Sequence, residues 1–152
     1  MGEDFKRMVL TKIALVNLGI GVYGNPIKEV PVSQENIKNA KEILVEIQQK
    51  YWGKLETRWK MFFFVARTRI CEWNGEREEA FQSISKALKL SSKGKFRGEL
   101  INIQQTHNRL FIQKIIFGLF REKSYLLLIC AIVLYFLYTF CFISFYGDHS
   151  TF

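Results

Sequence analysis

The sequence predicts an all-α fold: a short solenoid of antiparallel helix hairpins, about two and a half repeats long, followed by a C-terminal transmembrane helix. Three observations support this prediction. Apolar residues recur every three to four positions through most of the chain, and only two prolines interrupt it. A stretch without charged side chains, Tyr125 to Tyr146, then lies close to the C-terminus.

The composition indicates one small folded domain. The chain has 152 residues, of which 49% are apolar and 15% aromatic, which argues against disorder. Its three cysteines, Cys71, Cys130 and Cys141, form no Cys-x-x-Cys pair and no disulfide framework. This usage favours a reducing location for the part outside the membrane.

Two helices are expected in the first third of the chain. The first runs from Asp4 to about Val22 and is followed by a loop that contains Pro26 and Pro31. Ser33 is then the N-cap of the second helix. The predicted core stripe of the first helix is Phe5, Met8, Val9, Ile13, Val16 and Ile20, and that of the second is Ile37, Ala40, Ile43, Leu44 and Ile47.

Three more helices are expected after these. The third runs from about Leu55 to Trp73 and ends at Asn74-Gly75, although its apolar run at 61–66 also allows a strand. The fourth runs from Glu76 to about Leu90, with acidic residues in its first turn and lysines in its last, as the helix dipole favours. The fifth extends from about Arg97 to Phe120 after a Ser-Ser-Lys-Gly turn.

The second and fourth helices share a pattern. A shift of about 40 residues aligns their small and bulky apolar positions, as expected of stacked helix pairs. The aligned residues are Ala40, Leu44 and Ile47 in one helix and Ala80, Ile84 and Ala87 in the other.

The residues from the third to the fourth helix resemble the tetratricopeptide repeat. The repeat's aromatic, glycine, alanine, bulky, alanine and leucine positions correspond to Cys71, Gly75, Ala80, Ile84, Ala87 and Leu88. The chain departs from the family pattern at Arg67 and Thr68, where a Leu-Gly pair is usual, and at Ser92, where a proline is usual.

The resemblance implies a protein or peptide partner on the concave face made by the first helix of each repeat. In that register the face would carry five residues, namely Phe62, Val65, Arg69, Glu72 and Trp73. Core packing competes as the role of the two apolar ones. We therefore take Arg69, Glu72 and Trp73 as the candidate partner-binding residues, since a cation beside an aromatic ring suits an acidic or amphipathic ligand.

The apolar run predicts the localisation. Nine basic residues against two acidic ones lie between Lys86 and Lys123, directly before Tyr125–Tyr146, and Asp148 is the only charge after it. This asymmetry predicts a tail-anchored, single-pass protein with a cytoplasmic N-terminus, in the endoplasmic reticulum or secretory pathway rather than the mitochondrial outer membrane. The expected division is 1–96 helical hairpins, 97–124 basic juxtamembrane helix, 125–146 transmembrane helix and 147–152 tail.

Signals for chemistry are weak. Gly19 to Gly24 fits the dinucleotide-binding pattern G-x-G-x-x-G, but Pro26 and Pro31 prevent the long helix that such a site needs, so the glycines should end the first helix and shape a loop. The two histidines, His107 and His149, are too few for a metal cluster. We expect no enzyme activity, no cofactor, no small-molecule substrate and no nucleic acid partner.

The sequence thus predicts a membrane-anchored, non-catalytic interaction module with a protein or peptide partner, held to lipid through Tyr125–Tyr146. Two alternatives stay open. The helices could form a structural subunit of a membrane complex. Alternatively, the chain could be a fragment of a longer soluble repeat protein with a different end, since eight of the 14 phenylalanines follow position 110.

Overall fold

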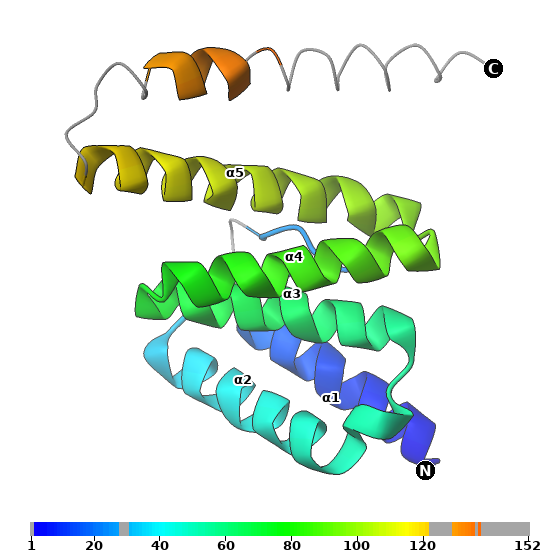
Figure 1. The fold of residues 1–152 in the computed structure, drawn as a ribbon. Coiled ribbons are helices and arrows are strands. Elements are labelled where there is room, and N and C mark those ends of the chain that lie inside the picture. Colours follow the sequence, from blue (N-terminus) through cyan, green and yellow to red (C-terminus); the bar gives the residue numbers. More distant parts are fainter. Residues whose placement is uncertain (1, 28–30, 122–128, 136, 138–152) are drawn as a thin grey trace. The chain divides into compact units, whose positions relative to one another are not determined.

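A computed structural model of the chain describes residues 2–27, 31–121, 129–135 and 137. It contains α1 (Glu3–Asn17), α2 (Gln34–Glu46), a π turn (Ile47–Tyr51), a 3-10 turn (Trp52–Lys54), α3 (Thr57–Asn74), α4 (Arg77–Gly94) and α5 (Arg97–Arg121). Figure 1 shows these helices in order along the chain. The described ranges hold no strand beyond an isolated bridge between Ile20 and Pro26. The predicted all-α class is confirmed.

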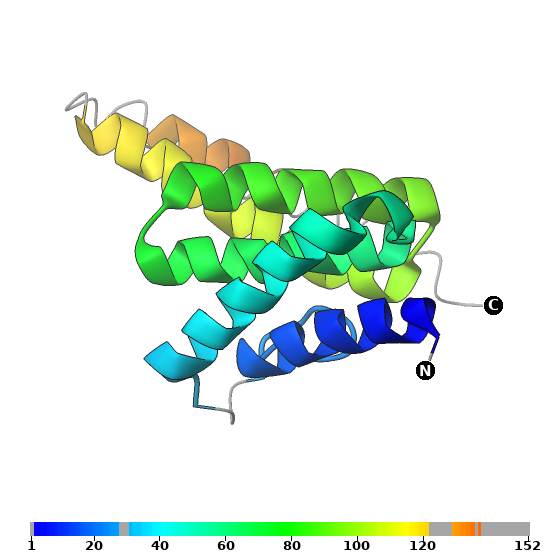
Figure 2. The same cartoon turned by 90° about the horizontal axis from the view of Figure 1, so that it is seen from below.

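The chain divides into two compact units, Met1–Leu110 and Phe111–Phe152, and the division falls within α5. In the first unit α1 packs against α2, α3 packs against α4, and both α1 and α2 contact α3. Figure 2 shows α2 crossing α1 obliquely, whereas α3 and α4 lie side by side as a hairpin. The packing contacts among α1, α2, α3 and α4 all lie within this first unit.

α5 joins the first unit through polar contacts with α3. Arg58, in the first turn of α3, pairs with Glu99, and Glu72, near the end of α3, pairs with Arg109. The partners follow the same order along both helices, so α3 and α5 run parallel.

Three helices end with the same backbone motif. After α1, the N–H of Gly19 donates to the carbonyl of Val16 (3.0 Å) and the N–H of Ile20 to that of Leu15 (2.9 Å). The equivalent pairs recur around Gly75 and Lys95, and in all three the motif turns on a residue with positive φ. Such a residue satisfies the last carbonyls while reversing the chain, so each helix stops there.

This motif corrects the end of the first helix. We expected the helix to reach about Val22, but α1 ends at Asn17 because Gly19 turns left-handed at φ 63°. The prediction that these glycines end the helix and shape the loop is confirmed.

The predicted core stripe of α1 is largely wrong. Phe5, Ile13 and Val16 are exposed, and the buried residues of the helix are Arg7, Thr11, Ala14 and Leu15. Both sides of this helix are apolar in sequence, so periodicity alone could not select the inner one. Burial suits Thr11 because its hydroxyl donates to the Arg7 carbonyl at 2.9 Å, and it suits Arg7 because its guanidinium pairs with Glu3 and Asp4.

The helix predicted from about Leu55 to Trp73 is confirmed as α3, Thr57–Asn74, and the predicted start of α2 is confirmed as well. Ser33 accepts a hydrogen bond from the N–H of Asn36 at 3.1 Å, as an N-cap does. The run that also allowed a strand is helical, and it is buried on several sides because α1, α2 and α4 all pack around α3. Its buried members are Met61, Phe62, Phe63, Val65 and Ala66.

α4 is longer than predicted. It continues through Ser91 to Gly94 instead of ending near Leu90, and its left-handed residue is Lys95 rather than the neighbouring glycine. The position of Gly94 has another cause: a Cβ there would lie 2.2 Å from the Phe96 ring. Close packing, and not the turn itself, thus explains this glycine.

The predicted C-terminal transmembrane helix is wrong. Among the described residues, no helix is both long enough and apolar enough to cross a membrane. α5 is long but carries Arg109 and Lys114, and the helical stretch 129–135 rises only about 10 Å, against about 30 Å of bilayer core. Of the expected span Tyr125–Tyr146, positions 125–128, 136 and 138–146 lie outside the described residues, as does the tail 147–152.

The localisation fails with the helix on which it rested. A single-pass, tail-anchored protein with a cytoplasmic N-terminus in the endoplasmic reticulum or secretory pathway is contradicted by the same observation. The name juxtamembrane helix for 97–124 is withdrawn as well, and the lipid contact through Tyr125–Tyr146 is not maintained.

The expected repeat positions are buried in both hairpins. Ala40, Leu44 and Ile47 on one side, and Ala80, Ile84 and Ala87 on the other, all belong to one core. The alanines let α2 and α4 approach their neighbouring helices closely. This packing is compatible with a helical repeat.

Candidate functional site

One face of the first unit gathers the residues for which the sequence suggested a role. Phe62, Val65, Arg69 and Glu72 recur on α3 every three to four positions, so they share one side of that helix. Gly98, Asn102 and Arg109 lie on the parallel α5, where Arg109 contacts Glu72. We call these seven residues, together with Trp73 of α3, the α3–α5 face.

The N-terminal half of this face is covered. Phe62 and Val65 are only 3% and 6% exposed, as residues packed into the core are. The turn after α1 also lies over them, because a Cβ on Gly24 would be 3.8 Å from Val65 and 4.0 Å from Phe62.

The C-terminal half carries the predicted partner-binding residues. Arg69 Nη1 lies 3.9 Å from a Glu72 carboxylate oxygen, and the Arg69 guanidinium lies 5.8 Å from the centre of the Trp73 ring. The structure adds Arg109, whose Nη2 donates to the other Glu72 oxygen at 2.6 Å. Two arginines from two helices therefore share one carboxylate beside an aromatic ring.

Burial and charge in this cluster are uneven. The Glu72 side chain is 16% exposed, so it serves mainly to hold the arginines, whereas Trp73 is 45% exposed. With two cations and one anion the cluster keeps a positive charge. Arg69 Nε is buried and finds no hydrogen-bond partner within the described part of the chain. This geometry suits an acidic group with apolar surface next to it.

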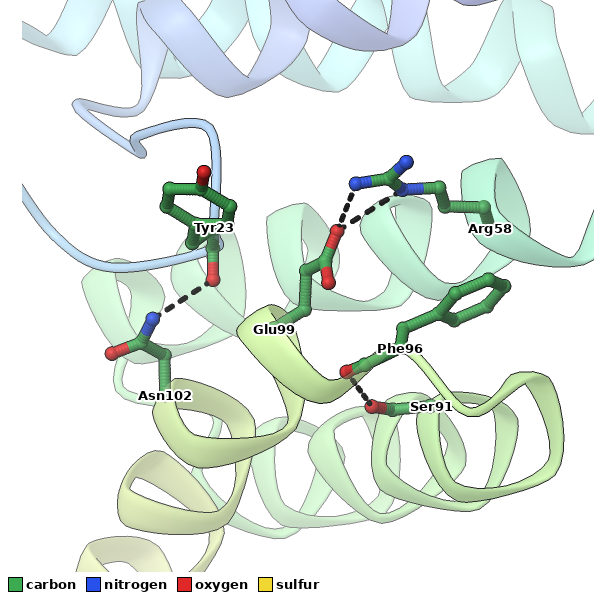
Figure 3. Close-up of polar contacts among 6 residues, drawn as sticks. All are labelled: Tyr23, Arg58, Ser91, Phe96, Glu99 and Asn102. Atoms are coloured by element: carbon green, nitrogen blue, oxygen red, sulfur yellow. Dashed lines mark hydrogen bonds and ion pairs between the residues drawn. The ribbon is translucent and has the colours of Figure 1, made fainter. Parts of the chain in front are cut away.

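A second set of polar contacts positions the cluster. Figure 3 shows Glu99, which is 3% exposed, reaching from α5 to Arg58, whose Nε lies 3.0 Å from Glu99 Oε1. The same view shows the Ser91 hydroxyl donating to the Phe96 carbonyl (3.4 Å). These contacts tie α5 to α3 and to the end of α4, and so fix the register that brings Arg109 to Glu72.

Sequence reasoning missed Arg109, Asn102 and Tyr23. Asn102 Nδ2 donates to the Tyr23 carbonyl at 3.1 Å across 79 residues of chain. A parallel third helix of the repeat would have placed Arg109 opposite Glu72, so extending the register into α5 could have found it. The contact of Asn102 with the Tyr23 carbonyl could not be found in this way, because no local sequence pattern predicts a distant backbone acceptor.

The Cys71 thiol and the His107 imidazole, which lie outside this face, have the surroundings of structural residues. Burial, with a contribution from the Glu76 carboxylate, raises the pKa of the Cys71 thiol to about 11, which disfavours the reactive thiolate. His107 stacks on Phe81 with ring centres 5.0 Å apart. Within the ranges that the structure describes, no group of three metal-ligating side chains comes together.

No known protein family, curated protein or solved structure matches this chain. The tetratricopeptide-like character therefore stays a prediction from the residues that carry the resemblance.

Proposed function

We propose that this chain is a non-catalytic protein–protein interaction module, built of tetratricopeptide-like helix hairpins, that binds a peptide segment of a protein partner. The observation that carries the proposal is the cluster of Arg69, Glu72, Trp73 and Arg109. It combines charge and apolar area on rigid helices.

The cluster has the properties of a binding hot spot. Arginine and tryptophan are the side chains most enriched among residues that dominate interface energies. Arg69 and Arg109 keep part of their side chains exposed, at 34% and 49%, while Glu72 restricts their rotamers. A preordered arginine loses less entropy when it binds a carboxylate. The preferred ligand is accordingly an Asp or Glu followed by an apolar residue that packs on Trp73.

Selection from a library of short random peptides on the full chain tests this proposal. We expect enriched peptides to pair an acidic residue with an aromatic or aliphatic one, and to lose affinity as salt screens the charges. Arg69→Ala and Arg109→Ala should each weaken the enriched peptides about tenfold, and Trp73→Ala by a similar factor.

Lys93→Ala is the matched control, because it removes an exposed cation from the last turn of α4 without touching the cluster. It should leave peptide affinity unchanged. Peptides that bind the Arg69, Arg109 and Trp73 variants as tightly as the original chain would rule out this site, provided that circular dichroism shows the variants folded.

A second candidate function is a structural subunit of a larger assembly. The observation that favours it is the outer side of α1, where Phe5, Ile13 and Val16 are exposed although they are large and apolar. Sedimentation of the purified chain separates the two functions: a subunit should self-associate, and Val16→Lys should reduce that association, whereas a module should sediment as a monomer.

A further inference from the structure

The turn Ile20–Ile27, between α1 and α2, lies across both helices of the α3–α5 face. Gly24 approaches Val65 and Phe62 on α3, and a Cβ on Gly98 of α5 would lie 3.1 Å from the Tyr23 ring. Figure 3 shows the Tyr23 carbonyl directed at Asn102, which donates to it. The turn thus occupies the part of the face that the repeat resemblance assigned to a partner.

After Ile20, whose side chain is buried in the core, the turn is held to the face by its backbone more than by its side chains. It is closed on itself, since the N–H of Gly21 donates to the Asn25 carbonyl (2.7 Å) and that of Ile27 to the Gly19 carbonyl (2.7 Å). Val22 and Tyr23 keep 77% and 56% of their surface exposed. Ile20 is 5% exposed and would stay in the core as the anchor of the turn, so little side-chain area would have to be uncovered for the residues after it to leave.

The surface beneath the turn has a defined chemistry. Phe62 and Val65 offer apolar contact, and Gly98 leaves room for a ring. The Asn102 carboxamide can donate a hydrogen bond to any backbone carbonyl. This half of the face thus matches an uncharged segment with a small residue. The C-terminal half of the face instead carries the charged cluster around Arg69 and Arg109.

We propose that the turn Ile20–Ile27 is a built-in occupant of a peptide site on the α3–α5 face, and that the partner displaces it with an uncharged, glycine-containing segment of its own. This inference rests on the proposed function. Because the turn is tethered, it competes with the partner at a high effective concentration. The partner's apparent affinity is therefore proportional to the fraction of molecules in which the turn has left the face.

The probe for this inference is a labelled peptide with the sequence of residues 19–27, titrated into the full chain. In the original protein the tethered turn should exclude it. In the double variant Tyr23→Gly and Asn25→Gly, the turn loses its ring contact with Gly98 and the Asn25 side chain that packs on Gly21, and gains backbone freedom. We expect this opened variant to bind the peptide at least about tenfold more tightly than the original chain.

Asn102→Leu in the opened variant removes the donor to the peptide carbonyl and should return binding to the original level. Lys93→Ala in the same background is the control and should change nothing. Equal binding by the original and opened chains, no binding by a folded opened variant, or insensitivity to Asn102→Leu would each overturn the inference. Its failure is separable from that of the proposed function, because peptides selected through Arg69 and Arg109 are measured independently.

Discussion

Lys95 adopts a backbone conformation that residues other than glycine disfavour. It adopts φ 55°, in the left-handed region, at the motif that ends α4, while the equivalent positions after α1 and α3 are Gly19 and Gly75. A residue with a Cβ costs about 1–2 kcal/mol in this region. The neighbouring Gly94 does not relieve the cost, because it lies inside the helix.

Lys95→Gly should therefore stabilise the protein. We expect the free energy of unfolding to rise by about 0.5–1 kcal/mol, since relief of the left-handed strain exceeds the extra chain entropy of glycine. Urea denaturation followed by circular dichroism measures the change.

Lys93→Gly provides the contrast, because it makes the same chemical change within α4. It should lower the free energy of unfolding by up to about 1 kcal/mol, because glycine is a poorer helix former than lysine and position 93 is still helical. If both substitutions destabilised the protein, the left-handed assignment of Lys95 would be wrong.

At the scale of elements, the contact between Arg58 and Glu99 joins the start of α3 to the start of α5. The two partners differ in burial, since the Glu99 side chain is 4% exposed and that of Arg58 is 47%. Removing Arg58 and removing Glu99 therefore have different effects on stability. An unpaired carboxylate in the interior is the costlier result.

Arg58→Ala should lower the free energy of unfolding by about 3 kcal/mol, because Glu99 then stays buried without its cation. It should also speed amide hydrogen exchange in the first half of α5. The double variant with Glu99→Leu should recover most of the loss, since no charge is left buried. Equal stability of the single and double variants would contradict this account of the contact.

At the scale of the whole first unit, the two hairpins should be equivalent if the chain is a helical repeat. Ala40 and Ala80 occupy matching positions and are both fully buried. Ala40→Leu and Ala80→Leu should each lower the free energy of unfolding by about 1–3 kcal/mol, through overpacking.

The matched surface changes Lys38→Leu and Gln82→Leu, on the same two helices, should stay within about 0.5 kcal/mol of the original protein. Urea denaturation of the four variants gives the comparison. Tolerance of leucine at position 40 but not at 80 would show that only the second hairpin packs as a repeat.

Local sequence signals predicted the elements and part of the site. Ser33, Gly75 and the two prolines act over a few residues of backbone, so the helix starts and stops that depend on them could be read directly. The pairing of a cation with an aromatic ring at Arg69 and Trp73 is also local, because positions four apart meet on a helix.

Only tertiary packing decided the rest. Both sides of α1 are apolar, and the choice of the inner one depended on which side lets Thr11 and Ala14 approach their neighbours. The contacts of Glu72 with Arg109 and of Asn102 with Tyr23 span 37 and 79 residues, so no local pattern contains them. The sequence predicted a membrane-spanning helix, whereas no helix among the described residues is long and apolar enough to cross a membrane. Apolar periodicity and the scarcity of proline predicted by themselves that this chain folds as helices, and the three-dimensional register of α1, α3 and α5 decided which side chains form its candidate site.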